Sequence, residues 1–261
     1  MPKRDDVVPM YAGNKTALVT TSWDDGHALD LRVAERLATY GVKGTFYVPI
    51  DYPIIPRMSR HEILELRRMG MEIGSHTQTH PRIHRLNAGK VLRELCESKA
   101  YLEDLLGEEI RAFCYPEGKF TPQQLPLLDQ AGYKLARTTV GFRTSLDFEP
   151  HLMPVGFQFW PHSRHTLLRH ALMQGNVRGA TDWMRLWRGE HDLGRLAQAM
   201  LQHILNAGGV LHIWGHSWEV EQRGLWTELE NMLKRISDCG SLLSVTNSQV
   251  LEVVEQKDVC V

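Results

Sequence analysis

The chain has 261 residues, of which 43% are hydrophobic and 23% charged, and its formal net charge is −1. These totals are typical of a globular protein with a sizeable core, and the balanced charge provides no basic surface for nucleic acid. The four cysteines form no CxxC pair, which argues against a zinc finger or a disulfide framework. Because we find neither a signal-peptide core nor an apolar run of roughly 18 residues, we expect a cytoplasmic protein without a membrane span.

Strand and helix patterns alternate along the whole chain. Apolar and β-branched runs predict strands at 17–23, 44–49, 71–76, 110–116, 133–138, 153–160 and 210–216. Helical apolar stripes with capping residues predict helices at 28–41, 60–70, 86–107, 121–132, 163–175, 193–209, 225–240 and 248–256. Residues 181–189 indicate only a short amphipathic turn, which carries Trp183 and Trp187.

About seven β-α units follow one another without a linker or an internal repeat. We therefore predict a single α/β domain over residues 1–261, with its core at about 18–250. The strands are apolar on both faces, which is typical of a parallel sheet. Closure of this sheet into a barrel is favoured, and an open doubly wound sheet is the alternative. Residues 161–192 are the least regular part, and we expect them to shape substrate choice.

Chemically active side chains stand where the predicted strands end. The first strand ends in Asp24 and Asp25, and the third ends in His76, with His80 four residues later. In an α/β barrel these ends carry the active site. Two histidines and one carboxylate form a metal site with open positions, whereas a lone histidine is more often structural. The zincin motif is excluded because Thr77 stands where that motif has glutamate.

Other strand ends extend the pattern. "CYPEG" follows the fourth strand, Arg137 ends the fifth, and His216 ends the strand "VLHIWGH". Taken alone, "DDG" is as typical of a turn as of a site. Two adjacent acids are costly unless a positive group neutralises one of them, and a bound divalent ion would do so.

The segments "TTSWDDG", "SHTQTH", "FCYPEG" and "VLHIWGH" resemble, in order and spacing, the motifs of the polysaccharide deacetylase family. This is the chitooligosaccharide deacetylase-like group, carbohydrate esterase family 4. The likeness extends from about Leu18 to His216. It implies a distorted (β/α)7 barrel and removal of N- or O-acetyl groups from sugars with one divalent metal ion, often zinc.

The resemblance also implies a role for each matching residue. Asp25, His76 and His80 would be the metal ligands, and Asp24 would be the general base that takes a proton from the attacking water. The backbone N–H of Glu117 would hold the oxyanion together with the metal.

His216 would be the general acid that protonates the leaving amine. His212 lies four positions earlier in the same strand and points to the same side, so it stays an alternative. We prefer His216, which lies nearer the carboxyl end of the strand, and interpret His212 as a core residue. His27 and Glu219 are polar neighbours of the motifs and are candidates for substrate contact, but a capping or solvated role is the simpler interpretation for each.

The chain departs from the family pattern at two places. Cys114 stands where the family commonly has an arginine that orients the catalytic acid, and Arg137 on the neighbouring strand is a candidate substitute or a peripheral salt bridge. The family's Asp-Trp motif after the fifth strand has no clear counterpart. Trp160, Trp214 and Trp218 are candidate sugar-stacking surfaces or ordinary core residues.

Three functions remain open at this point. The first is a metal-dependent hydrolase that removes an N-acyl group, expected to be acetyl, from a saccharide or a soluble or lipid-linked sugar precursor. The second is a cyclic amide or imide hydrolase of the same fold. The third is a catalytically weak sugar-binding homologue, which the cysteine at position 114 would explain. The sequence predicts a saccharide partner and leaves the oligomeric state unknown.

Overall fold

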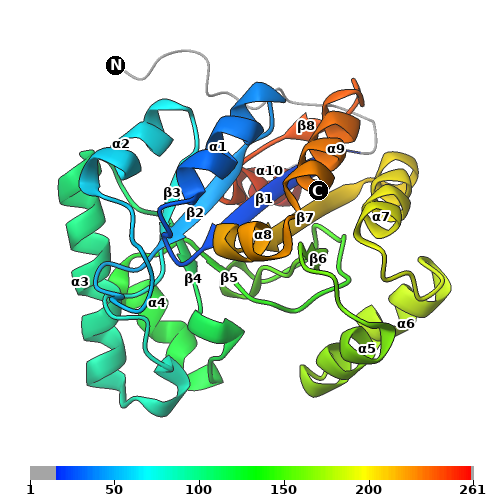
Figure 1. Cartoon of the computed structure of the whole chain (residues 1–261). Coiled ribbons are helices and arrows are strands. Elements are labelled where there is room, and N and C mark those ends of the chain that lie inside the picture. The colour runs from blue at the N-terminus through cyan, green and yellow to red at the C-terminus, as the bar shows by residue number, and fades with distance from the viewer. Residues whose placement is uncertain (1–15, 260–261) are drawn as a thin grey trace.

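The computed structural model describes residues 16–259, and it forms a curled sheet surrounded by helices (Figure 1). The strands are β1 (Ala17–Asp24), β2 (Gly44–Val48), β3 (Glu72–Ser75), β4 (Ala112–Cys114), β5 (Leu135–Arg137), β6 (Phe157–Gln158), β7 (Gly209–Gly215) and β8 (Leu243–Ser244). The α-helices are α1 (Asp30–Thr39), α2 (Arg60–Arg68), α3 (Ala88–Leu106), α4 (Leu125–Ala131), α5 (Arg164–Met173), α6 (Val177–Arg185), α7 (Leu193–Ala207), α8 (Ser217–Arg223), α9 (Trp226–Ser237) and α10 (Asn247–Val259). Short 3-10 turns are η2 (Ile83–Arg85), η3 (Pro116–Gly118), η4 (Pro122–Gln124) and η5 (Pro150–Leu152).

The sheet is parallel, and its strands follow the order β5-β4-β3-β2-β1-β7-β6, with β8 paired to the start of β1. The segment that leads into β6 bridges the two ends of this order. Met153 pairs with Arg137 of β5, and the backbone N–H of Gly156 donates to the carbonyl of His212 in β7. The single-domain distorted barrel is therefore confirmed, and the open doubly wound alternative is wrong.

Alternation along the strands separates two cores. Residues of one parity face the helices, among them Val19, Phe46, Phe113, Ala136 and Leu211. Residues of the other parity point into the barrel, namely Leu18, Tyr47, Ala112, Leu135 and Val210. They pack there with Val250, Leu251 and Val253 of α10. Because α10 occupies the lower part of the interior, polar side chains of the same parity gather towards the carboxyl ends of the strands.

The predicted elements agree with the structure except at four places. Residues 177–185 form helix α6 rather than a short turn, since Asn176 caps its first turn and Trp183 anchors it in the core. The predicted strand 153–160 contributes only Phe157 and Gln158 as regular strand. Helix α8 and strand β8 were not predicted, because each is short and lacks a periodic apolar pattern.

No helix in residues 16–259 is both long and apolar enough to cross a membrane.

Candidate active site

The turn after β1 separates the two adjacent acids. Asp24 is the last residue of the strand, whereas Asp25 has φ +81° and Gly26 has φ +61°. A Cβ added to Gly26 would approach Val48 Cγ1 to 3.0 Å, so glycine suits this position both by its conformation and by its size. The reversal sends the two carboxylates in different directions, and they meet different partners.

Asp25, His76 and His80 form a cluster whose ligand atoms all lie within 4.8 Å of one another. Asp25 Oδ1 is 3.4 Å from His80 Nε2 and 3.8 Å from His76 Nε2, and the two imidazole nitrogens are 3.2 Å apart. The side chain of Thr77 accepts a hydrogen bond from the backbone N–H of His80, which supports the loop between the histidines as the motif implied. The structure thus brings together the three predicted ligands.

The tautomer of His76 suits metal ligation. Its Nδ1–H donates to the carbonyl of Cys114 at 2.8 Å, which leaves the lone pair of Nε2 free toward the cluster. Burial, followed by the neighbouring His80, lowers the pKa of His76 to about 4, so the imidazole is neutral as a ligand must be. The converging donor atoms and this tautomer fit a divalent cation.

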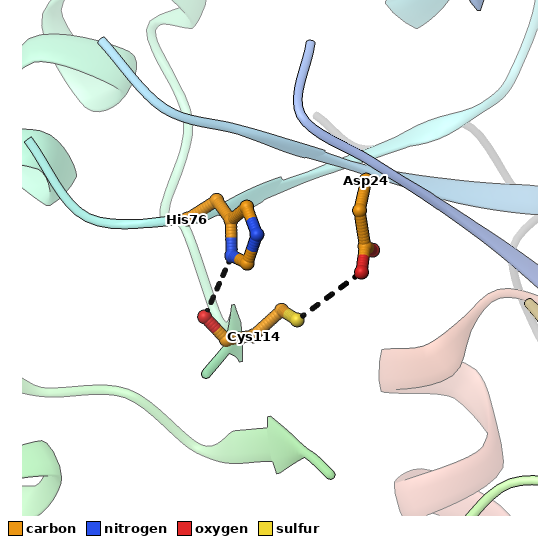
Figure 2. Close-up of side chains that lie close together, drawn as sticks. All are labelled: Asp24, His76 and Cys114. Carbon is orange, nitrogen blue, oxygen red and sulfur yellow. Dashed lines mark hydrogen bonds between the residues drawn. The ribbon is translucent and has the colours of Figure 1, made fainter. Parts of the chain in front are cut away.

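A second group of donor atoms, from Asp24, His76 and Cys114, lies beside the first (Figure 2). Here the Cys114 thiol donates to Asp24 Oδ2 at 3.7 Å, and burial raises the pKa of this thiol well above its usual value. Asp24 is also neutralised from its other side by an arginine. The first cluster, which has two imidazoles and a carboxylate that no arginine neutralises, is therefore the better cation site.

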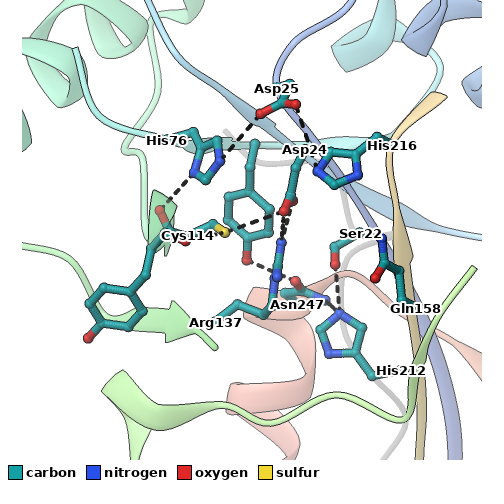
Figure 3. A network of polar contacts seen from close by, with 12 residues as sticks. Ser22, Asp24, Asp25, His76, Cys114, Arg137, Gln158, His212, His216 and Asn247 are labelled. Carbon is teal, nitrogen blue, oxygen red and sulfur yellow. Dashed lines mark hydrogen bonds and ion pairs between the residues drawn. The ribbon is translucent and has the colours of Figure 1, made fainter. Parts of the chain in front are cut away.

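Arg137 is the arginine that holds Asp24 (Figure 3). Its Nη2 donates to both carboxylate oxygens of Asp24, and both side chains are buried. Burial, the largest single effect, raises the pKa of Asp24, but Arg137 together with the nearby His76 and His216 outweighs it, and the net pKa is lowered. Arg137 of β5 is the register partner of Cys114 of β4. The guanidinium that pairs with Asp24 therefore comes from β5, whereas the family pattern has its arginine at the position of Cys114. The peripheral salt bridge considered for Arg137 is wrong.

His216 lies on the opposite side of Asp25, with its Nε2 3.7 Å from Asp25 Oδ2. Its Nδ1–H donates to Glu219 Oε2 at 2.8 Å, and the same carboxylate oxygen accepts from Gln158 at 3.0 Å. Burial lowers the pKa of His216, but the bond to Glu219 and the nearby acids raise it to about 9. Helix α8 brings Glu219 one turn after His216, so the solvated role expected for Glu219 is wrong.

His212 is fully buried below His216 and does not reach the mouth of the barrel. Its Nδ1–H donates to the carbonyl of Pro154 at 3.2 Å, and its Nε2 accepts from the Ser22 hydroxyl at 2.8 Å. Burial, followed by the nearby Arg137, lowers the pKa of His212 to about 3. These contacts agree with the core role that the sequence suggested for it.

Left-handed backbone is concentrated at the site. Six non-glycine residues of the described chain have positive φ, and four of them are Asp25, Thr77, His80 and Glu117. Such conformations cost roughly 1–3 kcal/mol each and persist where the surrounding structure enforces them. The side-chain carboxylate of Glu117 pairs with Arg82 and Lys119, so it is occupied outside the cluster.

The remaining candidates take varied positions. His27 Nδ1 accepts from the backbone N–H of Leu29 just before α1, although no side chain caps the first turn of that helix. Trp214 lines the cleft, with the Arg137 guanidinium 4.9 Å from its ring centroid. Trp160 is covered by Arg223, and the Trp218 indole N–H donates to Asp25 Oδ2 at 3.1 Å.

A cleft of about 750 Å³ opens over the cluster. One wall contains Tyr52, whose ring lies 4.3 Å from that of His80, and Glu117. The opposite wall contains Gln158, His162 and residues of α5. The volume suits a small saccharide, and the floor presents Asp24 and His216 with the cluster of Asp25, His76 and His80 between them.

Comparison with known proteins points to the same family as the sequence motifs do. Residues 12–136 match the family model described as polysaccharide deacetylase. YxkH of Bacillus subtilis (strain 168) is 25% identical over 127 residues, which are 48% of this chain and 45% of YxkH. The chain spans less than half the length of the curated relatives it matches.

Solved structures show a similar fold. A crystal structure from Mycobacterium smegmatis superposes with a TM-score of 0.68 and 15% identity over 95% of this chain and 93% of that chain. The peptidoglycan deacetylase PdaC from Bacillus subtilis gives 0.54 and 16% over 93% and 94%. BA3943 from Bacillus anthracis, a pseudoenzyme of carbohydrate esterase family 4, gives 0.52 and 16% over 90% and 66%.

Fold and site together define a parallel α/β barrel with a two-histidine, one-carboxylate centre at its mouth. The family match, which covers the strands that carry Asp24, Asp25, His76 and His80, confirms the resemblance to the polysaccharide deacetylase family.

Proposed function

We propose that the chain is a metal-dependent deacetylase that hydrolyses an N-acyl group, in the first place acetyl, on a saccharide or sugar precursor. The observation that carries this proposal is the joint placement of three groups around one cleft. Asp25, His76 and His80 form the cation site, Asp24 lies beside it in an ion pair, and His216 faces it from the other side. A divalent cation bound there, zinc in this proposal, would polarise the acyl carbonyl and acidify water.

Asp24 would take the proton from the attacking water at one of its carboxylate oxygens. Its lowered pKa keeps it ionised at neutral pH, so it is in the form that accepts a proton. Arg137 would hold the carboxylate in one orientation, while the Cys114 thiol restricts it from the side. Since Asp25 and Asp24 have separate positive partners, the repulsion between adjacent acids is compensated.

His216 would deliver a proton from Nε2 to the leaving nitrogen. Glu219 holds the ring by Nδ1 and raises its pKa, so that the imidazolium is present at neutral pH. The backbone N–H of Glu117, in the wall of the same cleft, is the proposed donor to the oxyanion. A proposed base and a proposed acid at separate positions around the cation site support acyl transfer to water.

Of the alternatives, the weak sugar-binding homologue loses its main argument, because Arg137 supplies the cation that Cys114 lacks. Structural similarity to a pseudoenzyme concerns the fold and not this site. A cyclic imide hydrolase stays an alternative reaction on the same groups. The cytoplasmic location stays a prediction.

The test uses the purified chain, its bound metal measured by mass spectrometry, and acetate release from a panel of N-acetyl sugars. We expect one equivalent of divalent metal and turnover that a chelator abolishes and zinc restores. Turnover without metal contradicts the proposed centre. Ring opening of an imide without acetate release supports the second reaction, and sugar binding without turnover supports the third.

A further inference from the structure

Helices α5 and α6 expose an apolar surface that the barrel does not need. Six large apolar side chains are exposed in the described part of the chain. Five of them lie in the fifteen-residue stretch 172–186, in or next to these helices: Leu172, Met173, Val177, Met184 and Leu186. Met173 is 75% exposed and Val177 66%. Exposed apolar residues concentrated in one segment mark an interaction site rather than chance.

The same helices are basic. Five exposed arginines alternate with the apolar residues between positions 164 and 188, and Asp182 is the only acid in that range: Arg164, Arg169, Arg178, Arg185 and Arg188. The segment thus has a net charge of +4, whereas the whole chain has −1. Within residues 16–259 none of these arginines forms a salt bridge, so their charge is available to a partner. We call Leu172, Met173, Val177 and the five arginines the α5–α6 surface.

The α5–α6 surface is held in place from behind. Trp183 and Trp187 are buried and pack on Phe142, and Asn176 donates to the carbonyl of Gly141 at 2.6 Å. Neither tryptophan lines the cleft, so an effect of residues 161–192 on substrate choice, which stays a prediction, would come from other side chains of this segment. Because these buried side chains already attach the segment to the barrel, its exposed face needs no further partner within the described chain.

The position of this surface relates it to the cleft. Leu167, His170, Met173 and Gln174 of the same segment line the wall of the candidate active site. In Figure 1 helices α5 and α6 project from the barrel on the side away from α3. Ile54, the sixth exposed apolar side chain, follows Tyr52 on the opposite wall of the cleft. Whatever binds the α5–α6 surface is adjacent to the cleft mouth.

We propose that the α5–α6 surface docks the protein on an anionic lipid bilayer, with the cleft mouth at the level of the headgroups. Arginines interleaved with leucine, methionine and valine match such a surface, where cations meet phosphates and apolar side chains enter the acyl boundary. A nucleic acid would use the arginines but has no place for the apolar residues. A twofold contact with a second copy would bring two segments of charge +4 together.

The test is co-sedimentation of the full chain with vesicles of phosphatidylcholine alone or with about a third phosphatidylglycerol. We expect partition into the anionic vesicles, weakened by high salt, and little into the neutral ones. Each cation near an anionic leaflet contributes roughly fivefold to the partition. Arg178→Glu with Arg185→Glu should therefore weaken binding more than tenfold, and Leu172→Ser with Val177→Ser should weaken it without changing the charge.

Lys90→Glu with Arg93→Glu on α3 is the matched control, since it makes the same charge change on exposed residues far from the α5–α6 surface. This control should keep binding, and circular dichroism should show all variants folded. Failure of the unmodified chain to bind anionic vesicles overturns the proposal, as does equal weakening by the control pair. Dimerisation without vesicles that Leu172→Ser with Val177→Ser abolishes assigns the surface to a second copy instead. The readout needs no turnover, so it is independent of the proposed deacetylase activity.

Discussion

The mouth of the barrel and the layer beneath it contain similar residue types in opposite electrostatic settings. At the mouth, Asp25 and Glu219 surround the imidazole of His216, whose pKa rises to about 9. Four residues earlier in the chain, His212 is buried near Arg137, and its pKa falls to about 3. His212 lies within β7 and His216 directly follows the last residue of this strand. The charge of each is therefore decided by its neighbours and not by its place in the motif.

This difference assigns two tasks to the two layers. In the proposed mechanism the mouth would hold the cation, the base and the acid, whereas the layer beneath it neutralises Asp24 and fixes its direction. Substitutions at the mouth should then change metal binding or kcat with little effect on folding. Substitutions beneath it should change folding, and kcat only through Asp24.

The largest effect is expected for the two acids of the β1 turn. Asp24→Asn should lower kcat by about 10²–10⁴ while the metal content stays unchanged, because the base is lost and the ligands are kept. Asp25→Asn should lower the metal content itself. Kinetics together with metal analysis of each variant separates these outcomes.

Asp30→Asn is the matched control for both. Asp30 is buried close by and accepts from the Ser217 hydroxyl, and burial raises its pKa well above the usual value, which favours the neutral acid. Asparagine keeps the acceptor oxygen, and metal content and kcat should be preserved. Loss of metal in Asp24→Asn would mean that Asp24 is a ligand rather than the base.

The second effect concerns Arg137. Arg137→Ala leaves Asp24 buried without its cation, which should lower the free energy of unfolding by about 3–5 kcal/mol and kcat by roughly 10²-fold. Chemical denaturation and steady-state kinetics measure the two losses. Unchanged kcat in a folded Arg137→Ala variant contradicts the orienting role.

Returning the arginine to the other strand sharpens the same comparison. Cys114 and Arg137 are register partners and both approach Asp24. Cys114→Arg combined with Arg137→Ala should regain part of the lost kcat, whereas Cys114→Arg alone places two guanidinium groups in one buried site and should destabilise the fold.

A smaller effect is expected for Glu219. Glu219→Gln keeps the size of the side chain and removes the charge that holds His216, so kcat should fall roughly tenfold to a hundredfold with KM and metal content unchanged. Glu219→Asp should retain more activity than Glu219→Gln, since it keeps the charge. If KM rises and kcat does not change, Glu219 contacts substrate instead of positioning the acid.

The cluster of Asp25, His76 and His80 was predictable because each of its two parts is local in sequence. His76 and His80 are four residues apart on one loop, and "DDG" ends a recognisable strand, so residue type and spacing already indicate the site. The barrel followed from the count of β-α units and their apolar strands. Arg137 was named as a candidate because it ends the strand next to Cys114.

The supporting residues were less visible for physical reasons. Glu219 contacts His216 only because the short helix α8 begins directly after β7. A helix of seven residues is too short to show a clear periodic apolar pattern. Gln158 reaches Glu219 from a strand of two residues. Trp183 and Trp187 have the composition of a binding surface, but the choice between inward and outward faces of α6 depends on Phe142, which lies far away in sequence.

The smallest effect concerns stability and not catalysis, and it tests the lower layer alone. Neutral His212 uses both ring nitrogens, Nδ1 as a donor and Nε2 as an acceptor, so protonation would force the Ser22 hydroxyl to accept instead of donate and would bury a charge. Its pKa of about 3 in the folded state is below the ordinary value near 6.5 of the unfolded chain. As the pH falls below about 6.5, the unfolded state therefore gains protons that the folded state refuses. This histidine should cost about 2 kcal/mol of unfolding free energy between pH 7 and pH 5. Denaturant titrations of the unmodified chain and of His212→Gln at both pH values measure this term. The variant is less stable at pH 7, and the pH dependence should shrink in it. An identical dependence in both proteins means that other groups are responsible and that the lower layer does not hold His212 neutral.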